Sequence, residues 1–295
     1  MLGSNIVSQL SNGQLEVIQH SRSICDLSNS LATEKFIADS NPEVILHCAA
    51  KVGGINSKNT NNASDYLTNT TIDFNVMNAA WKLQVKNLVY MSSATIYPNL
   101  IVEEVPSKSL LRGKLEFSNA FYALAKLTGT NFVTNIALNY GVPWRTLVMP
   151  NLYGPYDDFE SDSAQVIPSI IRRGVNAKYL KLPNFEVRGA LTTKREFVFA
   201  PDIADWIVGK IGQLDDLPCV LNLGSGELIN MKTCYETILD VLGINPKLTF
   251  LEEFPSAQER PIMDSSIARN LGWNPSTKFR QGIERTIEWF SKEYK

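Results

Sequence analysis

The stretch Leu88-Val89-Tyr90-Met91-Ser92-Ser93 decides how this chain of 295 residues folds. Its first four residues are apolar or aromatic on both faces, as a strand buried between two layers of helices requires. The runs Leu15–Gln19, Val44–Cys48, Thr146–Met149 and Val220–Leu223 have the same character. We therefore expect each of these runs to form a strand.

Helical patterns separate these expected strands. Ala63–Trp81 and Asn119–Asn139 are the longest of them. Strands and helices in alternation predict an α/β fold with a Rossmann-like, doubly wound parallel sheet. Such a sheet binds its ligand beyond the carboxyl ends of its strands. The hydroxyl groups of Ser92 and Ser93 are therefore expected at the ligand-binding edge.

The alternation loosens after Tyr156, and the chain becomes helical again at Cys234–Leu242 and Thr277–Trp289. We interpret this part as a smaller C-terminal lobe that covers the substrate. The expected division is a dinucleotide-binding domain made of residues 1–155 and 196–224, and a substrate-binding lobe made of residues 156–195 and 225–295.

The composition argues against several classes of function. A net charge of -2 and a pI near 5.8 give no electrostatic reason to expect a nucleic acid or an anionic membrane as partner. The four cysteines lie far apart and lack the C-x-x-C spacing of a zinc site, so neither a metal nor a disulfide is expected. No apolar run approaches the roughly 18 residues of a membrane span, and no signal peptide is recognisable. We expect a soluble, cytoplasmic protein.

The amino terminus departs from the usual start of a dinucleotide-binding fold. Such a fold opens with an apolar strand and a G-x-x-G-x-x-G loop, and the next helix receives the pyrophosphate at its N-terminus. Here Gly3 can represent the last glycine of that loop, while the first strand and the earlier glycines are missing. Two explanations stay open: the true start lies upstream of Met1, or this copy is impaired in cofactor binding.

The most informative local pattern is Tyr122-Ala-Leu-Ala-Lys126, within a helical stretch. Residues four apart share one helix face, so the phenol and the ammonium group can point into the same cavity. A free phenol has a pKa of ~10, and a neighbouring cation lowers that pKa towards the range useful for acid–base catalysis. The same spacing also occurs by chance on many exposed helices.

Several motifs in a fixed order give this pair its context. They are S-S-x-x-I-Y-P at Ser92–Pro98, Y-x-x-x-K at Tyr122–Lys126, P-N-L-Y-G-P at Pro150–Pro155, V-I-P-x-x-I-R-R at Val166–Arg173 and R-E-F-V at Arg195–Val198. In this order they resemble the extended short-chain dehydrogenases of the NAD-dependent epimerase/dehydratase family. The stretch Ala49-Ala50-Lys51-Val52-Gly53-Gly54-Ile55 narrows the resemblance, because A-A-K-V-G-G-I is typical of GDP-L-fucose synthases.

The resemblance assigns three catalytic roles. Ser93 matches the serine that hydrogen-bonds the substrate carbonyl oxygen. Tyr122 matches the general acid that protonates this oxygen, and Lys126 matches the lysine that holds the nicotinamide ribose and lowers the tyrosine pKa. The implied reaction is NADPH-dependent reduction at C4 of a nucleotide-linked 4-keto-deoxy sugar, with GDP as the expected nucleotide.

The resemblance also assigns residues to the substrate pocket. Asn151, Arg173 and Arg195 match substrate-binding residues, the arginines near the diphosphate, where planar donors suit phosphate oxygens. Thr95 and Gln165 stand where GDP-L-fucose synthases have the cysteine and the histidine that invert the carbons beside the ketone. Neither side chain ionises near neutral pH, so we expect reduction without epimerisation.

The expected cofactor is NADP(H). The resemblance places Gly3, Asp26, Ala49 and Ala50 beside it. The predicted second strand lacks an acidic residue at its end to grip a ribose 2′-hydroxyl, whereas Arg22 nearby suits a 2′-phosphate. Arg22 as an ordinary surface residue is the other interpretation.

Two alternatives to a reductase stay open. One is a nucleotide-sugar epimerase or dehydratase of the same family, which would retain its cofactor tightly. The other is a truncated, non-catalytic remnant that binds nucleotide sugars. The resemblance further implies a homodimer formed through the helices that contain Asn69 and Tyr122.

Overall fold

A four-stranded parallel sheet forms the centre of the larger lobe. The structure is a computed structural model that describes residues 1–11, 15–52, 62–98, 104–116, 119–160, 164–251 and 260–294. The strands, in their order across the sheet, are β1 (Val44–His47), β2 (Asn87–Ser93), β4 (Trp144–Met149) and β8 (Val220–Asn222). Each pairs with its neighbours in parallel, which confirms the predicted α/β fold class.

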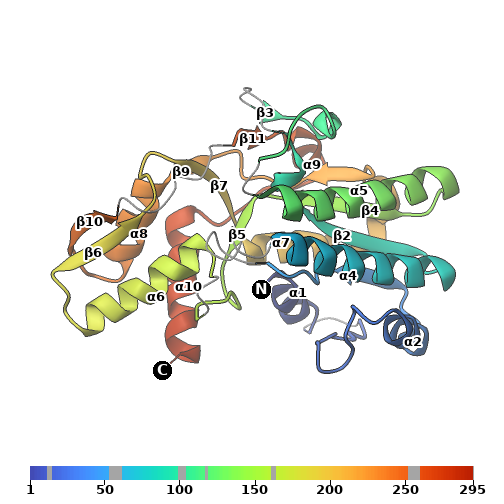
Figure 1. Cartoon of the computed structure of the whole chain (residues 1–295), viewed down its shortest axis with the longest axis horizontal. Helices are drawn as coiled ribbons and strands as arrows, with labels where there is room; N and C mark the ends of the chain where they lie inside the picture. Colours follow the sequence, from blue (N-terminus) through green and yellow to red (C-terminus); the bar gives the residue numbers. More distant parts are fainter. Residues whose placement is uncertain are drawn as a thin grey trace.

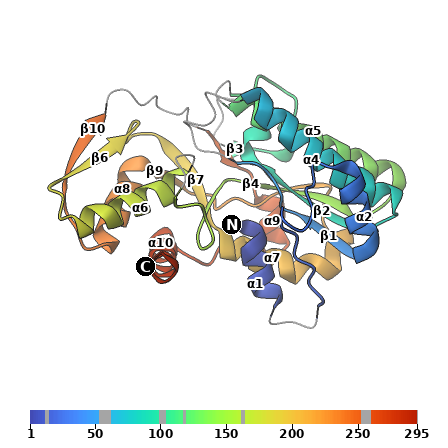
Figure 2. The same ribbon diagram turned by 60° about the horizontal axis from the view of Figure 1, so that its bottom comes forward.

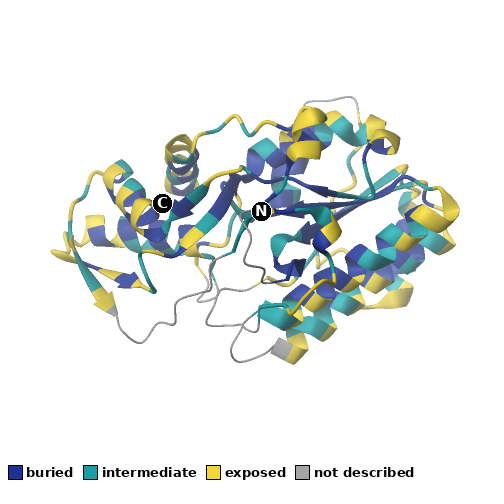
Figure 3. Ribbon diagram, turned by 90° about the horizontal axis from the view of Figure 1, so that it is seen from above, coloured by how far each residue is buried: buried dark blue, intermediate teal, exposed yellow. Residues whose placement is uncertain are grey.

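Helices cover both faces of this sheet (Figures 1 and 2). The helices α2 (Ser30–Ser40), α4 (Asn62–Lys82) and α5 (Ala120–Tyr140) lie on one face. The helices α1 (Leu2–Leu10) and α7 (Ala200–Lys210) pack together on the other. The sheet is therefore buried from both sides, and Figure 3 shows its strands mostly as buried residues with exposed ones on the outer faces of the helices.

The strand β2 shows why its sequence is apolar throughout. Leu88 and Tyr90 face the helices α4 and α5, whereas Val89 and Met91 face α1 and α7. Successive side chains of a strand point to opposite faces, so a strand covered on both faces needs apolar residues at every position. The helix α5 ends where Gly141 adopts a left-handed φ of 65°, a conformation that suits glycine.

The expectation of a strand at Leu15–Gln19 is wrong. These residues form no regular element, and the side chains of Leu15 and Ile18 are 55% and 49% exposed. Among the described residues, β1 is the outermost strand on this side and pairs with β2 alone. A strand needs the backbone groups of a neighbouring strand, and Leu15–Gln19 pairs with none in the described part of the chain.

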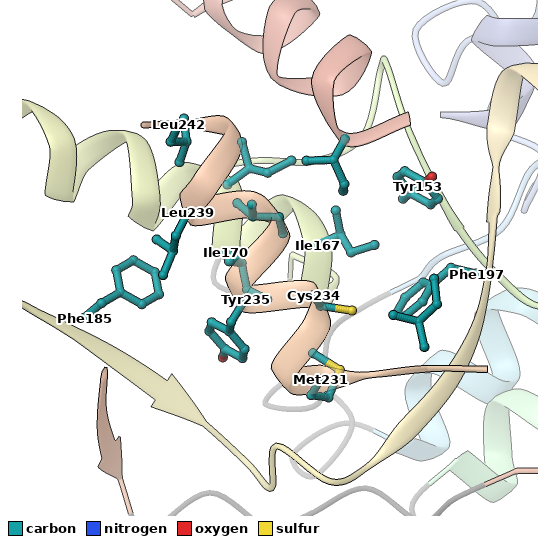
Figure 4. Close-up of a cluster of buried hydrophobic side chains, with 14 of the residues drawn as sticks. Tyr153, Ile167, Ile170, Phe185, Phe197, Met231, Cys234, Tyr235, Leu239 and Leu242 are labelled. Carbon is teal, nitrogen blue, oxygen red and sulfur yellow. The ribbon is translucent and has the colours of Figure 1, made fainter. Parts of the chain in front are cut away.

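The smaller lobe has a core of its own. Its principal helices are α6 (Val166–Tyr179), α8 (Met231–Val241) and α10 (Phe279–Glu293), with the paired strands β6 (Asn184–Arg188) and β10 (Lys247–Leu251) beside them. The strands β5 (Asn151–Tyr153), β7 (Lys194–Phe199) and β9 (Leu228–Asn230) form a second sheet at the boundary between the two lobes. Figure 4 shows side chains of α8, among them Tyr235 and Leu239, in one buried cluster with Phe185 and Ile170. The late helices expected from the sequence are thus confirmed, with shifted ends.

The remaining short elements are η1 (Ala94–Ile96), β3 (Glu104–Val105), η2 (Ser107–Ser109), η4 (Ile211–Asp216), β11 (Ile262–Met263) and α9 (Ser266–Asn270). Of these, η1 directly follows the carboxyl end of β2, whereas η4 packs at the amino end of the sheet, where its Leu214 carbonyl accepts from Arg145 Nε. No helix in the described ranges is both long and apolar enough to cross a membrane. The same ranges contain no cluster of three or more His, Cys, Asp or Glu residues suited to a metal ion.

Candidate active site

The carboxyl end of β2 carries the first candidate residue. Ser93 is half-buried, and its Oγ accepts a hydrogen bond from the backbone N–H of Thr95 at 3.3 Å, which caps the short helix η1. This bond leaves the hydroxyl proton of Ser93 free to be donated. Farther along the motif, Tyr97 donates its O–H to Asn222 Oδ1 at 2.6 Å, and so ties η1 to the end of β8. Tyr97 thus has a structural partner.

The helix α5 runs along β2 in the opposite direction. Ser92 Oγ and Thr130 Oγ1 lie 2.9 Å apart, and past the end of β2, Ile96 of η1 packs in one cluster with Leu127. Residues that follow the end of β2 in the sequence therefore lie beside earlier residues of α5. With a rise of about 1.5 Å per residue, Tyr122 lies about 12 Å along α5 from Thr130. Its position on the helix is beyond the carboxyl end of β2, on the same side as Ser93.

Lys126 lies one turn further into the helix and is almost fully buried. Its Nζ is 3.8 Å from Asp73 Oδ2 and 4.6 Å from the centre of the Tyr90 ring. Burial lowers the pKa of Lys126, while the negative charge of Asp73 opposes this shift. The buried ammonium group therefore has a counter-charge on α4.

Tyr122 is half-buried, and its hydroxyl group titrates differently from the sequence-based expectation. Burial raises the pKa of Tyr122, and the charge of Asp73 raises it further. The motif alone predicts that Lys126 lowers the pKa of Tyr122, but burial and the nearby carboxylate of Asp73 raise it instead. A phenol with a raised pKa is fully protonated at neutral pH, which suits a group that donates a proton.

Three of the residues assigned to the cofactor, Gly3, Ala49 and Ala50, lie where α1 begins and where β1 ends. A Cβ atom on Gly3 would lie 3.5 Å from Cys48 Cβ, so α1 starts against the carboxyl end of β1. Ala49 and Ala50 follow directly and are half-buried. Asn69 fixes the next residue, since its side chain accepts from the Lys51 N–H at 2.7 Å and donates to the Lys51 carbonyl at 3.0 Å. The remaining Gly53, Gly54 and Ile55 of this motif lie outside the described residues.

These residues fit a dinucleotide. A helix N-terminus at the carboxyl edge of a parallel sheet offers backbone N–H groups and a positive dipole end to a pyrophosphate. The side chain of Arg22 is 88% exposed and lies 3.8 Å from Asp26, with its guanidinium group accessible to a phosphate. Asp26 itself accepts hydrogen bonds from the N–H and the O–H of Ser28, and these bonds lower its pKa.

Thr95 and Gln165 come from different parts of the chain, η1 and the start of α6. Thr95 is buried in η1, and its Oγ1 has no hydrogen-bond partner among the described residues. Gln165 precedes the first residue of α6. A polar group of the substrate could hydrogen-bond this hydroxyl. Such a bond would offset the free energy that a buried hydroxyl without a partner costs the folded protein.

The other substrate candidates already have partners within the protein. Asn151 donates its side-chain N–H to the Glu196 carbonyl at 3.0 Å. Arg173 donates to the Glu186 carbonyl at 2.7 Å and stacks on the Phe185 ring, with its guanidinium carbon 5.0 Å from the ring centre. Arg195 donates to the Lys194 carbonyl at 2.7 Å. The structure thus places Arg173 in the core contacts of the smaller lobe.

Sequence reasoning missed a cation near η1. Arg260 forms an ion pair with Glu116, and both line a small hollow together with Ala94, Tyr97 and Met263. The hollow adjoins the segment that follows Ser93. Arg260 belongs to a stretch of sequence that shows no periodic pattern, so the sequence alone carried no signal for its position.

Sequence reasoning also missed Asp73, which lies in the middle of α4. Its two carboxylate oxygens accept from His47 Nε2 at 2.8 Å and from the Tyr90 hydroxyl. The interpretation of His47 as a core residue with a satisfied side chain is consistent with this contact. An acidic residue within a helix that packs on a buried sheet is the signal that could have drawn attention to it.

A parallel sheet with a serine at the end of a central strand, and a tyrosine and a lysine on the adjacent helix, defines the extended short-chain dehydrogenase class of fold. Residues 1–224 match the family described as the NAD dependent epimerase/dehydratase family, and the chain belongs to this family.

Individual relatives are similar over nearly the whole chain. GDP-L-fucose synthase 1 of Arabidopsis thaliana is 32% identical over 293 residues, which cover 99% of this chain and 90% of the relative. A crystal structure of a GDP-6-OMe-4-keto-L-xylo-heptose reductase from C. jejuni superposes with a TM-score of 0.92 at 23% identity, covering 99% of this chain and 95% of that one. A GDP-mannoheptose C4 reductase from Campylobacter jejuni with NADP bound gives a TM-score of 0.86 at 24% identity, covering 98% and 95%. The two solved structures establish the shared fold.

Proposed function

We propose that this protein is an NADPH-dependent reductase that acts at C4 of a GDP-linked 4-keto-deoxy sugar. The observation that carries the proposal is the position of Tyr122 on α5, beyond the carboxyl end of β2 that bears Ser93, with Lys126 one turn further along the same helix. The full-length similarity to a GDP-L-fucose synthase supports a GDP-linked sugar as the substrate class.

Each of the three residues has a distinct role in this reaction. Ser93 donates its hydroxyl proton to the carbonyl oxygen and fixes its direction. Tyr122, held protonated by its surroundings, gives its proton to the same oxygen as negative charge develops there. Lys126 supplies a fixed positive charge beside them. When bound, NADPH supplies the hydride.

The residues assigned to the cofactor favour NADP over NAD. Arg22 is exposed at the end of the segment that follows α1, and its planar guanidinium group suits a 2′-phosphate. Gly3 at the start of α1, with Ala49, Ala50 and Asp26, would hold the rest of the dinucleotide. The NADP in the similar Campylobacter jejuni reductase supports this choice.

The absence of two ionisable residues supports reduction without epimerisation. Thr95 and Gln165 have side chains that neither remove nor return a carbon-bound proton near neutral pH. Reaction of a GDP-linked 4-keto-6-deoxy sugar in deuterated water tests this point. We expect no deuterium on the carbons beside the ketone, and deuterium there would contradict the proposal.

The smaller lobe is proposed as the part that binds the nucleotide sugar. Its core, shown in Figure 4, is separate from the clusters on the two faces of the large sheet. We assign residues 156–195 and 225–295 to it, and 1–155 and 196–224 to the dinucleotide-binding domain. Asn151 and Arg195 would contact the substrate from the boundary, whereas Arg173 would first have to leave its contacts with Phe185 and Glu186.

We further propose a homodimer formed through α4 and α5. Both helices expose large apolar side chains to solvent: Leu67 and Phe74 on α4, and Phe121 and Leu124 on α5. A second copy of the chain would bury these side chains. Light scattering coupled to size-exclusion chromatography should give twice the mass of one chain, and Leu124→Glu should shift the mass to that of one chain.

The primary experiment is NADPH oxidation screened across GDP-, UDP- and dTDP-linked 4-keto sugars. We expect oxidation with the GDP-linked compounds and a stoichiometric yield of 4-hydroxy sugar. A tightly retained cofactor with interconversion of epimers and no net oxidation would instead identify an epimerase. Calorimetry that detects sugar-nucleotide binding but no NADP(H) binding would identify a non-catalytic protein.

A further inference from the structure

Lys126 belongs to a buried polar cluster inside the larger lobe. It consists of His47 at the end of β1, Asp73 on α4, Tyr90 on β2 and Lys126 on α5, so four elements each contribute one residue. The side chains of Lys126 and Asp73 are 3% and 4% exposed. Polar groups so deeply buried cost free energy unless they satisfy one another.

The contacts of the cluster converge on the carboxylate of Asp73. His47 Nε2 lies 2.8 Å from Oδ1, and the hydroxyl of Tyr90 donates to Oδ2. Lys126 Nζ is 3.8 Å from the same Oδ2. The pKa of Asp73, which burial alone would raise, is lowered overall by the charge of Lys126 and by these hydrogen bonds. Asp73 is therefore a carboxylate at neutral pH.

The surroundings keep Lys126 in one place. Its chain crosses the Tyr90 ring, and on the next turn of α5 a Cβ atom on Gly129 would come within 2.6 Å of that ring. The helix therefore approaches β2 as closely as a glycine permits. Two further titratable groups interact with Lys126 or Asp73. Cys48 interacts electrostatically with Lys126, and the charge of Asp73 raises the pKa of Tyr122. The ammonium group of the amino terminus acts on Cys48.

We propose that Asp73 is a positioning residue for the catalytic site: its carboxylate, held by His47 and Tyr90, keeps Lys126 charged and on the inner face of α5. Asp73 touches neither substrate nor cofactor in this account and acts through Lys126. The part of the proposal that concerns catalysis rests on the reductase function proposed above. The part that concerns the charge of Lys126 does not.

The charge of Lys126 can be followed directly. Protein labelled with ¹³C in its lysine side chains is titrated by NMR, and the Lys126 resonance is identified by its loss in Lys126→Met. Replacing the carboxylate in Asp73→Asn removes the interaction that favours the ammonium form. We expect Lys126 of Asp73→Asn to lose its proton at least about one pH unit below the unaltered protein, whereas coincident titration curves would overturn the proposal.

A second variant covers the case in which Asp73→Asn folds poorly. Tyr90→Phe keeps the carboxylate and the ring but removes one hydrogen bond to Asp73. We expect a smaller downward shift of the Lys126 titration in this variant, in the same direction. The matched control is Asp39→Asn, which breaks the exposed pair of Asp39 with Lys35 at 2.8 Å and should leave the Lys126 resonance unchanged. No shift in Tyr90→Phe, with intact folding, would contradict the clamping role of Tyr90.

The catalytic consequence is read from the pH dependence of kcat/KM with NADPH and the GDP-linked keto sugar. Loss of the carboxylate lowers the pKa of both Lys126 and Tyr122, so the alkaline limb of the profile should move to lower pH. At a fixed pH on this limb, the rate of Asp73→Asn should fall about tenfold for every pH unit by which the limb moves, and it should recover on acidification. A uniform loss at every pH would indicate a structural role only. If the unaltered protein shows no reductase activity, the reductase function fails, while the NMR titration still decides the charge of Lys126.

Discussion

The centre of the large sheet, around β2 and β4, and its edge at β1 differ in how completely the chain buries them. On the side of β2, β4 and α5, apolar strand residues are fully buried, and polar pairs such as Ser92 with Thr130 match across the interface. At β1, the strand is only partly buried, and the apolar run Leu15–Gln19 lies largely exposed nearby. The two sides have similar apolar sequences. A short apolar run is a strand only when it pairs with the backbone of another strand, and Leu15–Gln19 pairs with none in the described part of the chain.

The proposed chemistry belongs to the well-packed side, so the largest effect should come from Tyr122→Phe. Loss of the general acid should lower kcat/KM for the keto sugar by about 10²–10⁴-fold without changing the fold. Tyr140→Phe, at the exposed end of the same helix, is the matched control and should keep full activity. A Tyr122→Phe enzyme within a few-fold of the unaltered rate would remove Tyr122 from the mechanism.

A pair of leucine substitutions compares the two sides directly. Leu88 on β2 is completely buried, so Leu88→Ala should lower the free energy of unfolding by about 2–5 kcal/mol. Leu15→Ala should change it by less than about 0.5 kcal/mol, because Leu15 is mostly exposed. Denaturant unfolding measures both. A comparable cost at both positions would mean that Leu15–Gln19 is packed in solution.

A pair of glycine substitutions tests the close approach of α5 to β2. A Cβ atom on Gly129 would lie 2.6 Å from the Tyr90 ring, so Gly129→Ala should destabilise the protein by about 1–3 kcal/mol. Gly209 on α7 has nothing within 4 Å of such an atom. Gly209→Ala should therefore stabilise the protein by about 0.5–1 kcal/mol through its helix propensity. Equal effects of the two substitutions on thermal unfolding would refute the tight packing.

A pH-dependent effect on stability is expected near the start of α1. Burial raises the pKa of Asp157 to about 6, above the value of 3.8 for an unperturbed carboxyl group. A raised pKa means that the charged form is disfavoured in the folded state, so this group costs stability progressively between pH ~4 and pH ~6, and the cost is constant at higher pH. Asp157→Asn should gain up to about 3 kcal/mol at pH ~8 and nothing below pH ~4. A gain that does not depend on pH would show that the carboxyl charge is not its cause.

The sequence predicts best what depends on local pattern. The strands β1, β2, β4 and β8 and the helices α4 and α5 follow from apolar runs and helical spacing, because each has neighbours that reward burial. Leu15–Gln19 has the same local pattern but pairs with no strand among the described residues. Whether a run finds a pairing partner cannot be read from its local pattern. Whether these residues form a strand therefore depends on how the whole sheet is assembled.

The candidate site divides in the same way. Ser93, Tyr122 and Lys126 are recognisable because they occur in motifs with fixed spacing. Asp73 and Arg260 meet their partners across long separations in the chain, and such contacts depend on the tertiary packing of distant segments. The pKa of Tyr122 is raised, where the motif alone predicts that Lys126 lowers it. Burial and the carboxylate of Asp73 cause this rise, and neither could be predicted from the spacing of Tyr122 and Lys126.

The most direct test follows the hydride itself. The protein is given NADPH that carries deuterium at the transferable position of the nicotinamide, together with a GDP-linked 4-keto-6-deoxy sugar in ordinary water. The account predicts a product with one deuterium on the carbon that was the ketone, as seen by NMR. Formation of product without deuterium at that carbon, or consumption of the sugar with no oxidation of NADPH, would contradict it.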